Sequence, residues 1–419
     1  MVLKNDQQLT VVDGAIGTEA QKRAPNAEET LTELLNLTQP EVIKNIHRDY
    51  LKAGAQVLTT NTFSANEIRL SRSNRGKNLS EINEKGAGLA RKAIEDYAGK
   101  GEETLVAGSI GPTGETLVPI GDWTFAEFHE TFRSQAEALK RGGVDLLIIE
   151  TMESLREASA ALVASNETGL PVIASLSYGD RKRTSYGVVP ESGAVTLDFL
   201  GADGLGMNCG TGPEPYPDLI KIYNKFTSKP LLAEANAGNP RLEDGVAVYD
   251  LSPEKYLEEV KPGLPFLAAV GSCCGSNPDF TKALADIAPD YRSSTTPGTE
   301  NEKEFISNNS VVIPVSEELE FVEVKVLKDD LKNITEKVVE DRITMLRFSG
   351  LSRTEETLER DLSRQFLKLR SSDPIGIVTD DPGLLKTFLT AYPGISPVRA
   401  TGNKDHLERV AEKYGGRLI

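Results

Sequence analysis

The feature that most constrains the fold of this chain is an eightfold alternation of two sequence patterns. Short apolar runs, rich in β-branched residues, each end in a polar loop that contains Gly or Asn, and each is followed by an amphipathic helical pattern. The runs are Leu9–Val12, Gln56–Thr59, Leu105–Ser109, Leu146–Ile149, Val172–Ser177, Gly204–Met207, Leu231–Ala233 and Phe266–Val270. Eight strand–helix units are what a closed (β/α)8 barrel, or TIM barrel, requires, so we predict this α/β fold for residues 1–290.

The segments between the runs carry helix signals. Gln39–Leu51 places its apolar residues on one face, and Ser252-Pro253-Glu254 has the order of an N-cap, a first-turn proline and an acidic first turn. In such barrels the loops after the strands form the active face. Because the polar, Gly-rich motifs all lie in these loops, we expect them to converge on one mouth.

A second, smaller region follows the predicted barrel. Residues 291–310 include the polar Pro- and Gly-containing stretch Ser293–Asn301, which is typical of an interdomain linker. Residues 311–419 again alternate strand and helix patterns, which predicts a small α/β domain. The expected strands are Val311–Val315, Ile343–Phe348 and Ile375–Val378, and the expected helices are Thr354–Leu369, Gly383–Tyr392 and Asp405–Tyr414.

Composition and charge exclude several classes of partner. The net charge of −16 argues against nucleic acid or an anionic membrane surface, because binding phosphates needs clustered Lys and Arg. The sequence contains no run of 18 apolar residues, so we predict no membrane-spanning helix. The first residues lack the apolar core of a secretory signal, and three unpaired thiols fit a reducing compartment, so we expect a cytoplasmic protein.

The three cysteines are the strongest chemical signal. Cys209 stands alone after the sixth run, and Cys273 and Cys274 are neighbours after the eighth. A free Cys is commonly a small buried hydrophobe, and a disulfide between neighbours would be strained. All three lie in Gly-flanked loops at predicted strand ends, which favours metal binding. Three thiolates would hold zinc with one coordination position left open, as in catalytic rather than structural sites.

The motifs in these loops, taken in order, resemble those of a known family. The chain is similar to the zinc-dependent homocysteine S-methyltransferase family, which includes the N-terminal homocysteine-binding barrel of cobalamin-dependent methionine synthase. The resemblance covers roughly residues 8–290, and the lone Cys followed by a Cys-Cys-Gly motif is its most specific part. The motifs are Asp13–Thr18, Asn61–Asn66, Gly111–Gly114, Glu150-Thr151, Gly206–Glu214, Ala235–Pro240 and Cys273–Gly275.

The resemblance implies a role for each candidate site residue. Cys209, Cys273 and Cys274 would be the zinc ligands and so the catalytic residues. Asp13 and Glu150 match acidic positions that hold the amino group of homocysteine. The turn that contains Gly14, Ala15 and Thr18 would meet the substrate carboxylate, and Asn208 and Asn236 would be wall residues. Without the resemblance, Asp13 could simply begin a turn, whereas Glu150 ends an apolar strand, where a carboxylate needs a partner or a role.

The chemistry of thiols supports the same assignment. Only a thiolate attacks, and zinc acidifies a bound thiol. Three Cys ligands leave the metal site at −1 and a substrate thiolate makes it −2, so the substrate sulfur should be bound weakly enough to stay nucleophilic. A methyl group would then be taken by in-line displacement, and no histidine base is needed.

The C-terminal region bears on the methyl donor. Residues 374–419 look like part of the pterin-binding barrel that follows the homocysteine barrel in cobalamin-dependent methionine synthase. The Gly-Glu-Arg-Ile-Asn motif expected near the start of such a barrel is replaced by Val315–Glu320, and an Asp-x-His-x-x-Gly corrinoid signature is absent. The resemblance therefore favours methylcobalamin, brought by a separate corrinoid protein or in free form. S-Methylmethionine or betaine is the alternative donor.

Two other readings stay open. The acceptor could be a different small thiol or selenol, and the position of Asp13 and Glu150 relative to the metal discriminates this case. The protein could also be a non-catalytic zinc-binding barrel with a regulatory or docking role. Against that reading, all three ligands and both acidic positions are intact in the sequence.

Overall fold

The structure is a computed structural model. It describes residues 8–24, 31–72, 78–97, 104–239, 241–243, 246–293, 300, 303–339, 342–351, 354–368 and 374–419. The middle of the predicted linker and residues 1–7 lie outside this described part.

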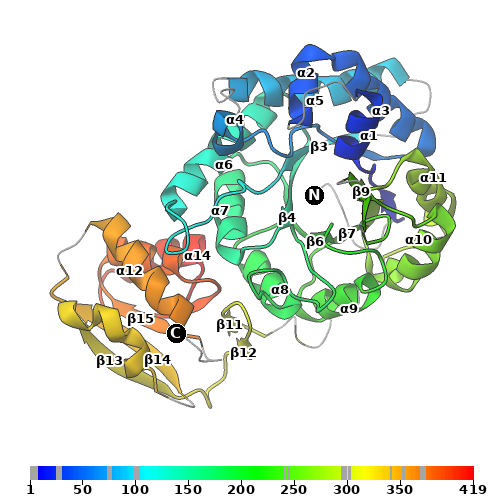
Figure 1. Ribbon diagram of the computed structural model, residues 1–419. Helices are drawn as coiled ribbons and strands as arrows, with labels where there is room; N and C mark the ends of the chain where they lie inside the picture. The colour runs from blue at the N-terminus through cyan, green and yellow to red at the C-terminus, as the bar shows by residue number, and fades with distance from the viewer. Residues whose placement is uncertain are drawn as a thin grey trace.

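Eight parallel strands form a barrel with the helices around it (Figure 1). Their order in the sheet is β1-β10-β7-β6-β5-β4-β3-β2, and an isolated bridge between Val12 and Val57 closes the ring. The TIM-barrel prediction is therefore confirmed. The strands are β1 Thr10–Val11, β2 Val57–Thr59, β3 Leu105–Ile110, β4 Leu146–Met152, β5 Val172–Leu176, β6 Gly204–Asn208, β7 Leu231–Ala235 and β10 Ala269–Ser272.

Alternate residues of the strands face two different cores. One apolar cluster takes residues from β2, β3, β4, β5, β7 and β10, such as Ile148 and Leu232, together with Val12, which follows β1, so it fills the barrel interior. The intervening residues, such as Leu147 and Val270, join the larger cluster formed with the helices. This two-sided burial explains why the strands appear in the sequence as continuous apolar runs.

The helices of the barrel begin and end at residues that satisfy their free backbone groups. α6 starts with a complete capping box between Thr124 and Glu127, and Ser252 caps α10 as predicted. α3 ends at Gly54 in the left-handed conformation. The helices are α1 Ile16–Arg23, α2 Leu35–Thr38, α3 Pro40–Ala53, α4 Glu67–Arg72, α5 Leu79–Tyr97, α6 Phe125–Arg141, α7 Leu155–Asn166, α8 Pro190–Phe199, α9 Tyr216–Phe226, α10 Pro253–Val260 and α11 Pro278–Ile287.

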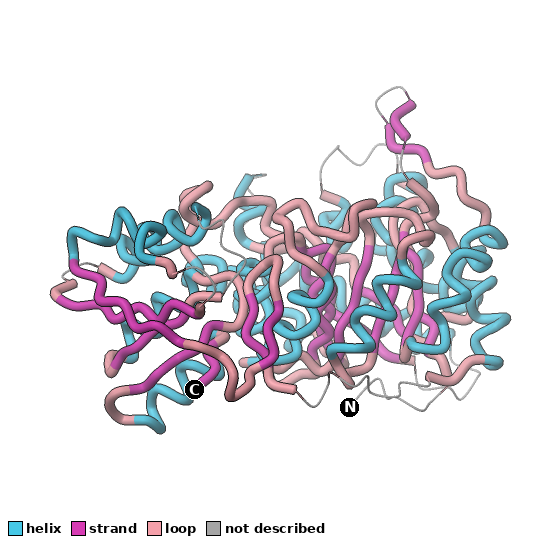
Figure 2. The backbone as a smooth tube through the Cα atoms, turned by 90° about the horizontal axis from the view of Figure 1, so that it is seen from below, coloured by secondary structure: helices cyan, strands magenta, loops and turns pink. Residues whose placement is uncertain are grey.

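One inserted hairpin departs from the simple alternation. Strands β8 Arg241–Glu243 and β9 Val246–Val248 pair antiparallel between β7 and α10. Figure 2 shows this hairpin standing out at the end of the barrel away from the described N-terminus. That end carries the loops after the strands. The last barrel strand begins at Ala269 rather than at the predicted Phe266, because Lys261–Phe266 form a 3-10 helix.

The C-terminal region is a five-stranded parallel sheet with its strands in sequence order. Its main apolar cluster, which includes Leu346, Phe366 and Phe388, lies between the sheet and its helices. The predicted strands and helices are present, and the structure adds strands that the sequence analysis did not find. The elements are β13 Phe321–Leu327, η5 Lys328–Lys337, β14 Ile343–Ser349, α12 Glu355–Lys368, β15 Gly376–Thr379, α13 Pro382–Ala391, β16 Ser396–Ala400, α14 Lys404–Tyr414 and β17 Gly416–Leu418.

A short hairpin joins the two regions. β11 Phe305–Ser307 and β12 Val312–Pro314 pair antiparallel, and β11 falls inside the predicted linker. Phe305 packs with Val195 of α8 and Ile395, whereas Ile306 packs on the second face of the C-terminal sheet. The end of the predicted linker therefore packs against both regions. The division into 1–290, 291–310 and 311–419 remains our proposal for the domain boundaries.

No helix of the described residues combines the length and the apolar character that crossing a bilayer requires.

Candidate functional site

The three cysteines meet at the mouth of the barrel. Cys209 follows β6, and Cys273 and Cys274 follow β10. Their sulfur atoms lie within 4.8 Å of one another, and the Sγ atoms of Cys209 and Cys274 are 3.9 Å apart. The structure thus brings together three thiols that are 64 and 65 positions apart in the chain.

This donor set fits a zinc ion. Zinc–sulfur bonds of about 2.3 Å at tetrahedral angles place the sulfur atoms roughly 3.8 Å apart. The Cys209–Cys274 separation matches that spacing, and each thiol is only partly buried, so a cation can reach the trio. Three protein ligands with an open fourth position is the arrangement of catalytic zinc sites.

The three thiols alter one another's pKa values. Hydrogen bonds from Cys209 and Cys273 lower the pKa of Cys274 to about 3, and Tyr249 adds a smaller hydrogen-bond contribution in the same direction. The hydrogen bonds with Cys209 and Cys274, together with burial, raise the pKa of Cys273 well above its usual value. The three sulfur atoms therefore lie close enough for hydrogen bonds among them to move these pKa values in opposite directions.

Unusual backbone conformations hold the two loops that carry the sulfurs. Cys209 (φ 57°) and Thr151 (φ 60°) both adopt the left-handed region, which is strained for residues with a Cβ. Asn208 ties these positions together: its Oδ1 accepts the Thr151 backbone N–H at 2.7 Å, and its Nδ2 donates to Thr151 Oγ1 at 2.8 Å. Gly275 leaves room for Tyr249, because a Cβ there would lie 2.2 Å from the Tyr249 ring.

Three carboxylates surround the approach to the sulfurs. Asp13 follows β1 and accepts hydrogen bonds from the Thr59 backbone N–H and hydroxyl, both at 2.9 Å. Glu150 lies at a register shift in β4 and accepts from Ser109 Oγ at 2.5 Å and from Asn208 Nδ2 at 3.1 Å. Glu234, on β7, is 6% exposed, and its side chain makes no hydrogen bond to the described residues.

These carboxylates form no ion pair with the described residues. Burial raises the pKa of Asp13 and of Glu234 well above the ordinary value, and the negative charges of the trio add to the rise. Burial also raises the pKa of Glu150 to about 7, against the effect of its hydrogen bond from Ser109. A cluster of acids with raised pKa values and no cation favours an incoming ammonium group.

The sulfurs and carboxylates line one cavity of about 700 Å³. Gly14, Ala15 and Thr18 line it too, together with the start of α1. Ala15 is the N-cap residue and has no side-chain cap, so the first N–H groups of α1 are open to an anion. Thr18 Oγ1 is buried and has no hydrogen-bond partner in the described part of the chain. The Ala15 N–H itself donates to Ser276 Oγ at 3.1 Å.

The two predicted wall asparagines lie behind the cavity surface. Asn208 is fully buried and holds Glu150 and Thr151 in place, so its contact with a ligand would be indirect. Asn236 is 3% exposed, and its Oδ1 has no partner among the described residues. Neither is among the residues that line the cavity.

Further charged residues line the cavity. Arg69 of α4, Glu33 and Glu157 line the same cavity, with Phe63 beside them. Sequence reasoning missed this group, and it also missed Glu234 and Tyr249. A carboxylate at the end of an apolar strand was the available signal for Glu234, as it was for Glu150; no comparable signal marks Arg69.

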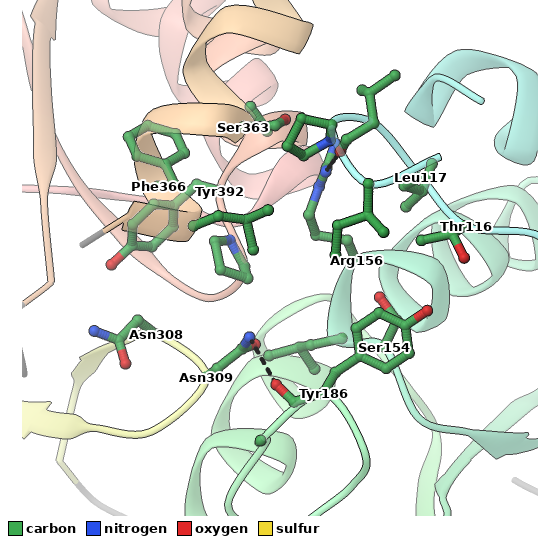
Figure 3. A pocket seen from close by; sticks show the side chains of 18 of the residues that line it. Thr116, Leu117, Ser154, Arg156, Tyr186, Asn308, Asn309, Ser363, Phe366 and Tyr392 are labelled. Atoms are coloured by element: carbon green, nitrogen blue, oxygen red, sulfur yellow. Dashed lines mark hydrogen bonds between the residues drawn. The ribbon is translucent and has the colours of Figure 1, made fainter. Parts of the chain in front are cut away.

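A second cavity of about 420 Å³ lies where the barrel meets the C-terminal region (Figure 3). Thr116 and Tyr186 line both cavities. In Figure 3, Phe366 and Tyr392 face Arg156 across it, and Asn309 Nδ2 donates to the Tyr186 carbonyl at 3.5 Å. The C-terminal region therefore borders the cavity that the three cysteines line.

Comparisons with known proteins agree with this geometry. The chain is 28% identical to the methionine synthase of Mycobacterium tuberculosis over 292 residues, which are 67% of this chain and 24% of that protein. It is also 28% identical to the methionine synthase of Mycobacterium leprae over 308 residues, 70% of this chain and 25% of that protein. The chain thus spans about a quarter of the length of these relatives.

Solved structures give a match to the barrel. The homocysteine methyltransferase MmuM from Escherichia coli superimposes in its oxidised form with a TM-score of 0.57 and in its metallated form with 0.56. Both are 25% identical to this chain and cover 67% of it and 96% of MmuM. The homocysteine S-methyltransferase family profile matches residues 10–288, which include all three cysteines and the three carboxylates. The chain belongs to the homocysteine S-methyltransferase family.

Proposed function

We propose that the protein transfers a methyl group to the thiol of homocysteine and so forms methionine. The observation that carries this proposal is the placement of three thiols and three uncompensated carboxylates on the wall of one cavity. The thiols suit a metal that binds a sulfur, and the carboxylates suit an ammonium group. A small thiol that also carries an amino group satisfies both.

The carboxylates hold the amino group in this proposal. Asp13 is kept in place by Thr59, and Glu150 by Ser109 and Asn208, so neither must reorganise to accept an ammonium. Glu234, with a pKa raised by burial and by the other two charges, gains most from a cation. The substrate carboxylate then lies at the start of α1, where open N–H groups and Thr18 Oγ1 are available.

Cys209, Cys273 and Cys274 would hold zinc, and the bound ion would supply the acidity that removes the proton from the substrate thiol. The other residues of the site contribute by orienting the substrate. Its carboxylates and α1 fix the amino acid so that the sulfur points to the sulfur cluster on one side and to the open cavity on the other. The new S–CH3 bond forms as the bond between methyl and donor breaks, and the donor leaves with that electron pair.

The cavity has room for the second reactant. Cavities of about 300–1,000 Å³ enclose drug-sized ligands, so homocysteine alone leaves part of these 700 Å³ free. A corrinoid-linked donor, methylcobalamin on a separate protein or free, is the donor that the resemblance of the C-terminal region suggests. S-Methylmethionine or betaine is the small alternative. We place the reaction in the cytoplasm, because three unpaired thiols fit a reducing compartment.

Zinc analysis and a homocysteine titration test the proposal. The zinc-loaded protein should release one proton per bound homocysteine and should form methionine when a donor is added. 4-Mercaptobutyrate, which keeps the thiol and the carboxylate but lacks the amino group, should bind about 10- to 100-fold more weakly, because charged hydrogen bonds of about 1.5–3 kcal/mol are lost. Equal binding of both compounds would favour a different thiol or selenol as acceptor.

A non-catalytic zinc protein with a regulatory or docking role is the competing reading. Full methyl transfer by metal-free protein would remove the basis of our proposal. Zinc and homocysteine binding without transfer from any donor tested would favour the non-catalytic reading.

A further inference from the structure

We propose that the cavity between the barrel and the C-terminal region binds a small organic anion with an aromatic ring (Figure 3). This inference concerns a cavity other than that of the cysteines, and it does not rest on the proposed function. Loops after β3, β4 and β5 form one wall, the turn of the β11–β12 hairpin forms another, and α12 with the end of α13 forms the third. A ligand there would contact both regions of the protein at once.

The first observation is that exposed apolar side chains gather around this cavity. Among the described residues, five large hydrophobic side chains are exposed, and three of them line the cavity: Ile120, Tyr186 and Leu367. Phe366 and Tyr392 are buried in its wall and lie edge to face, with ring centroids 5.5 Å apart. Exposed apolar surface beside a concave aromatic wall is typical of a ligand site. The volume of about 420 Å³ suits a small aromatic molecule.

The second observation is the sign of the charges around the cavity. The whole chain has 63 acidic residues against 47 lysines and arginines, yet within the described chain the lining of this cavity has two arginines and no acid. Glu359 neutralises Arg156, which still has free N–H groups, because it donates three hydrogen bonds and a guanidinium has five N–H groups. Arg183 forms no ion pair with a described residue, and its Nη1 donates only a long bond of 3.4 Å to the Gly187 carbonyl. The cavity therefore attracts an anion.

The third observation is a pair of buried oxygen atoms that have no hydrogen-bond partner among the described residues. Ser363 is 2% exposed, lines the cavity from α12 and leaves its Oγ unbonded. Asn309 Oδ1 is likewise buried and unbonded, while Nδ2 of the same side chain donates to the Tyr186 carbonyl at 3.5 Å. Figure 3 shows Ser363 and Asn309 on different sides of the cavity. Because a buried polar atom costs free energy unless something bonds it, these atoms indicate polar groups on a ligand.

The three observations together define the class of ligand. A flat ring would cover the aromatic wall and the exposed apolar side chains beside it. Arg183, which is exposed, would take the anionic group, and Ser363 and Asn309 would bond uncharged polar groups of the ligand. A cationic ligand would meet arginines without an acid, and a purely apolar one would leave both buried oxygens unbonded. The lining therefore favours an aromatic carboxylate over both.

Indole-3-acetate and indole-3-acetamide are a matched pair of probes for this site. They share the indole ring and its N–H, and they differ in the charge of the side group. Calorimetry with the full-length protein should give a Kd that is about 3- to 10-fold lower for indole-3-acetate, because only its carboxylate gains an ion pair with a partly solvated arginine. Acetate, which lacks the ring, should bind at least about tenfold more weakly. Equal Kd values for the matched pair, or acetate binding as tight as that of indole-3-acetate, would overturn the proposal.

Arginine variants test where the anionic group binds. Arg183→Met should bring the two Kd values close together. Arg181→Met removes a charge from the same loop, but Arg181 does not line the cavity, so the preference for indole-3-acetate should stay. An equal loss of preference in both variants would reveal a general effect of surface charge and would contradict a specific site.

Serine variants separate binding from folding. Ser363→Ala should weaken indole-3-acetate binding about 2- to 10-fold without lowering the Tm of the free protein, because the hydroxyl bonds none of the described residues. Ser165→Ala removes another buried, unbonded hydroxyl, from α7, that lines neither cavity, and it should leave the Kd unchanged. Cys274→Ser, in the other cavity, should leave it unchanged too. Wild-type binding in Ser363→Ala, or a loss of binding in Cys274→Ser, would place the probe elsewhere and refute the proposal.

Discussion

Arg156 of α7 and Glu359 of α12 form a buried ion pair across the boundary between the barrel and the C-terminal region. Arg156 Nη2 lies 2.7 Å from Glu359 Oε1, and their side chains are 11% and 7% exposed. The same carboxylate accepts the Phe125 N–H at 3.0 Å, and Arg156 also donates to the carbonyls of Thr390 and Val118. The two regions are thus held by one satisfied polar network beside the cavity of Figure 3.

Breaking that network should destabilise the protein strongly. Glu359→Ala leaves the Arg156 charge buried without its partner, so we expect a loss of about 3–5 kcal/mol in the free energy of unfolding. Denaturant unfolding followed by circular dichroism measures it. Arg360 is the next residue along α12, and its Nη1 lies 3.8 Å from Asp122 Oδ1 in a more exposed ion pair. Arg360→Ala should therefore lower the free energy of unfolding by less than about 1 kcal/mol. Similar losses in the free energy of unfolding for both variants would show that the buried ion pair contributes no more to stability than the exposed one.

Zinc should bind once per chain and should need all three sulfurs. Cys274→Ser should lower zinc content from one to near zero at micromolar protein, and it should abolish the rise in Tm that zinc gives the wild type. With free zinc at 1,000 times Kd, that rise corresponds to about 4 kcal/mol. His406→Ala changes an exposed histidine outside the site and should retain zinc. Full zinc content in the serine variant would contradict the assignment.

Binding of the amino group should depend on pH through Glu150. Its pKa is raised to about 7, so it is protonated below that value and cannot pair with an ammonium. The affinity for methionine, which has no thiol to titrate, should therefore fall by up to about tenfold per pH unit below pH 7 and level off above it. Calorimetry between pH 5 and 8 measures this. Glu150→Gln should weaken binding and flatten the profile; an unchanged slope would assign the titration to another group.

Neutralising Glu234 should stabilise the fold while it weakens substrate binding. The folded-state pKa of Glu234 is raised by burial, so its contribution is absent at low pH and becomes unfavourable as pH rises above its unfolded value of about 4.5. We expect Glu234→Gln to raise the free energy of unfolding by about 1–3 kcal/mol at pH 8 and to change it little at pH 5. Equal stability at both pH values would mean that the carboxylate is already compensated.

Sequence periodicity predicted the barrel because its strands are buried on both faces, as Leu147 and Ile148 illustrate. Two strands of the C-terminal sheet were harder to predict from the sequence. β16 contains Pro397, which cannot donate a backbone hydrogen bond to a neighbouring strand, and β17 has only three residues. The cysteines were recognisable from their spacing and their position at strand ends.

Other parts of the site had no local signal. Arg69 lies on a short helix beyond a loop, and only the closed ring of strands brings it to the cavity that Cys209 lines. The supporting role of Asn208 depends on a contact with Thr151, 57 positions away. Such relations come from the tertiary fold rather than from neighbouring residues in the chain.

The left-handed conformation of Cys209 has a consequence for laboratory evolution. Glycine or asparagine would occupy this backbone position with less strain, by about 1 kcal/mol, but neither carries a sulfur. A library selected for heat resistance alone, in the absence of zinc, should therefore enrich both residues at position 209. The enriched clones would tolerate heat better than the metal-free parent but would lack one of the three proposed zinc ligands.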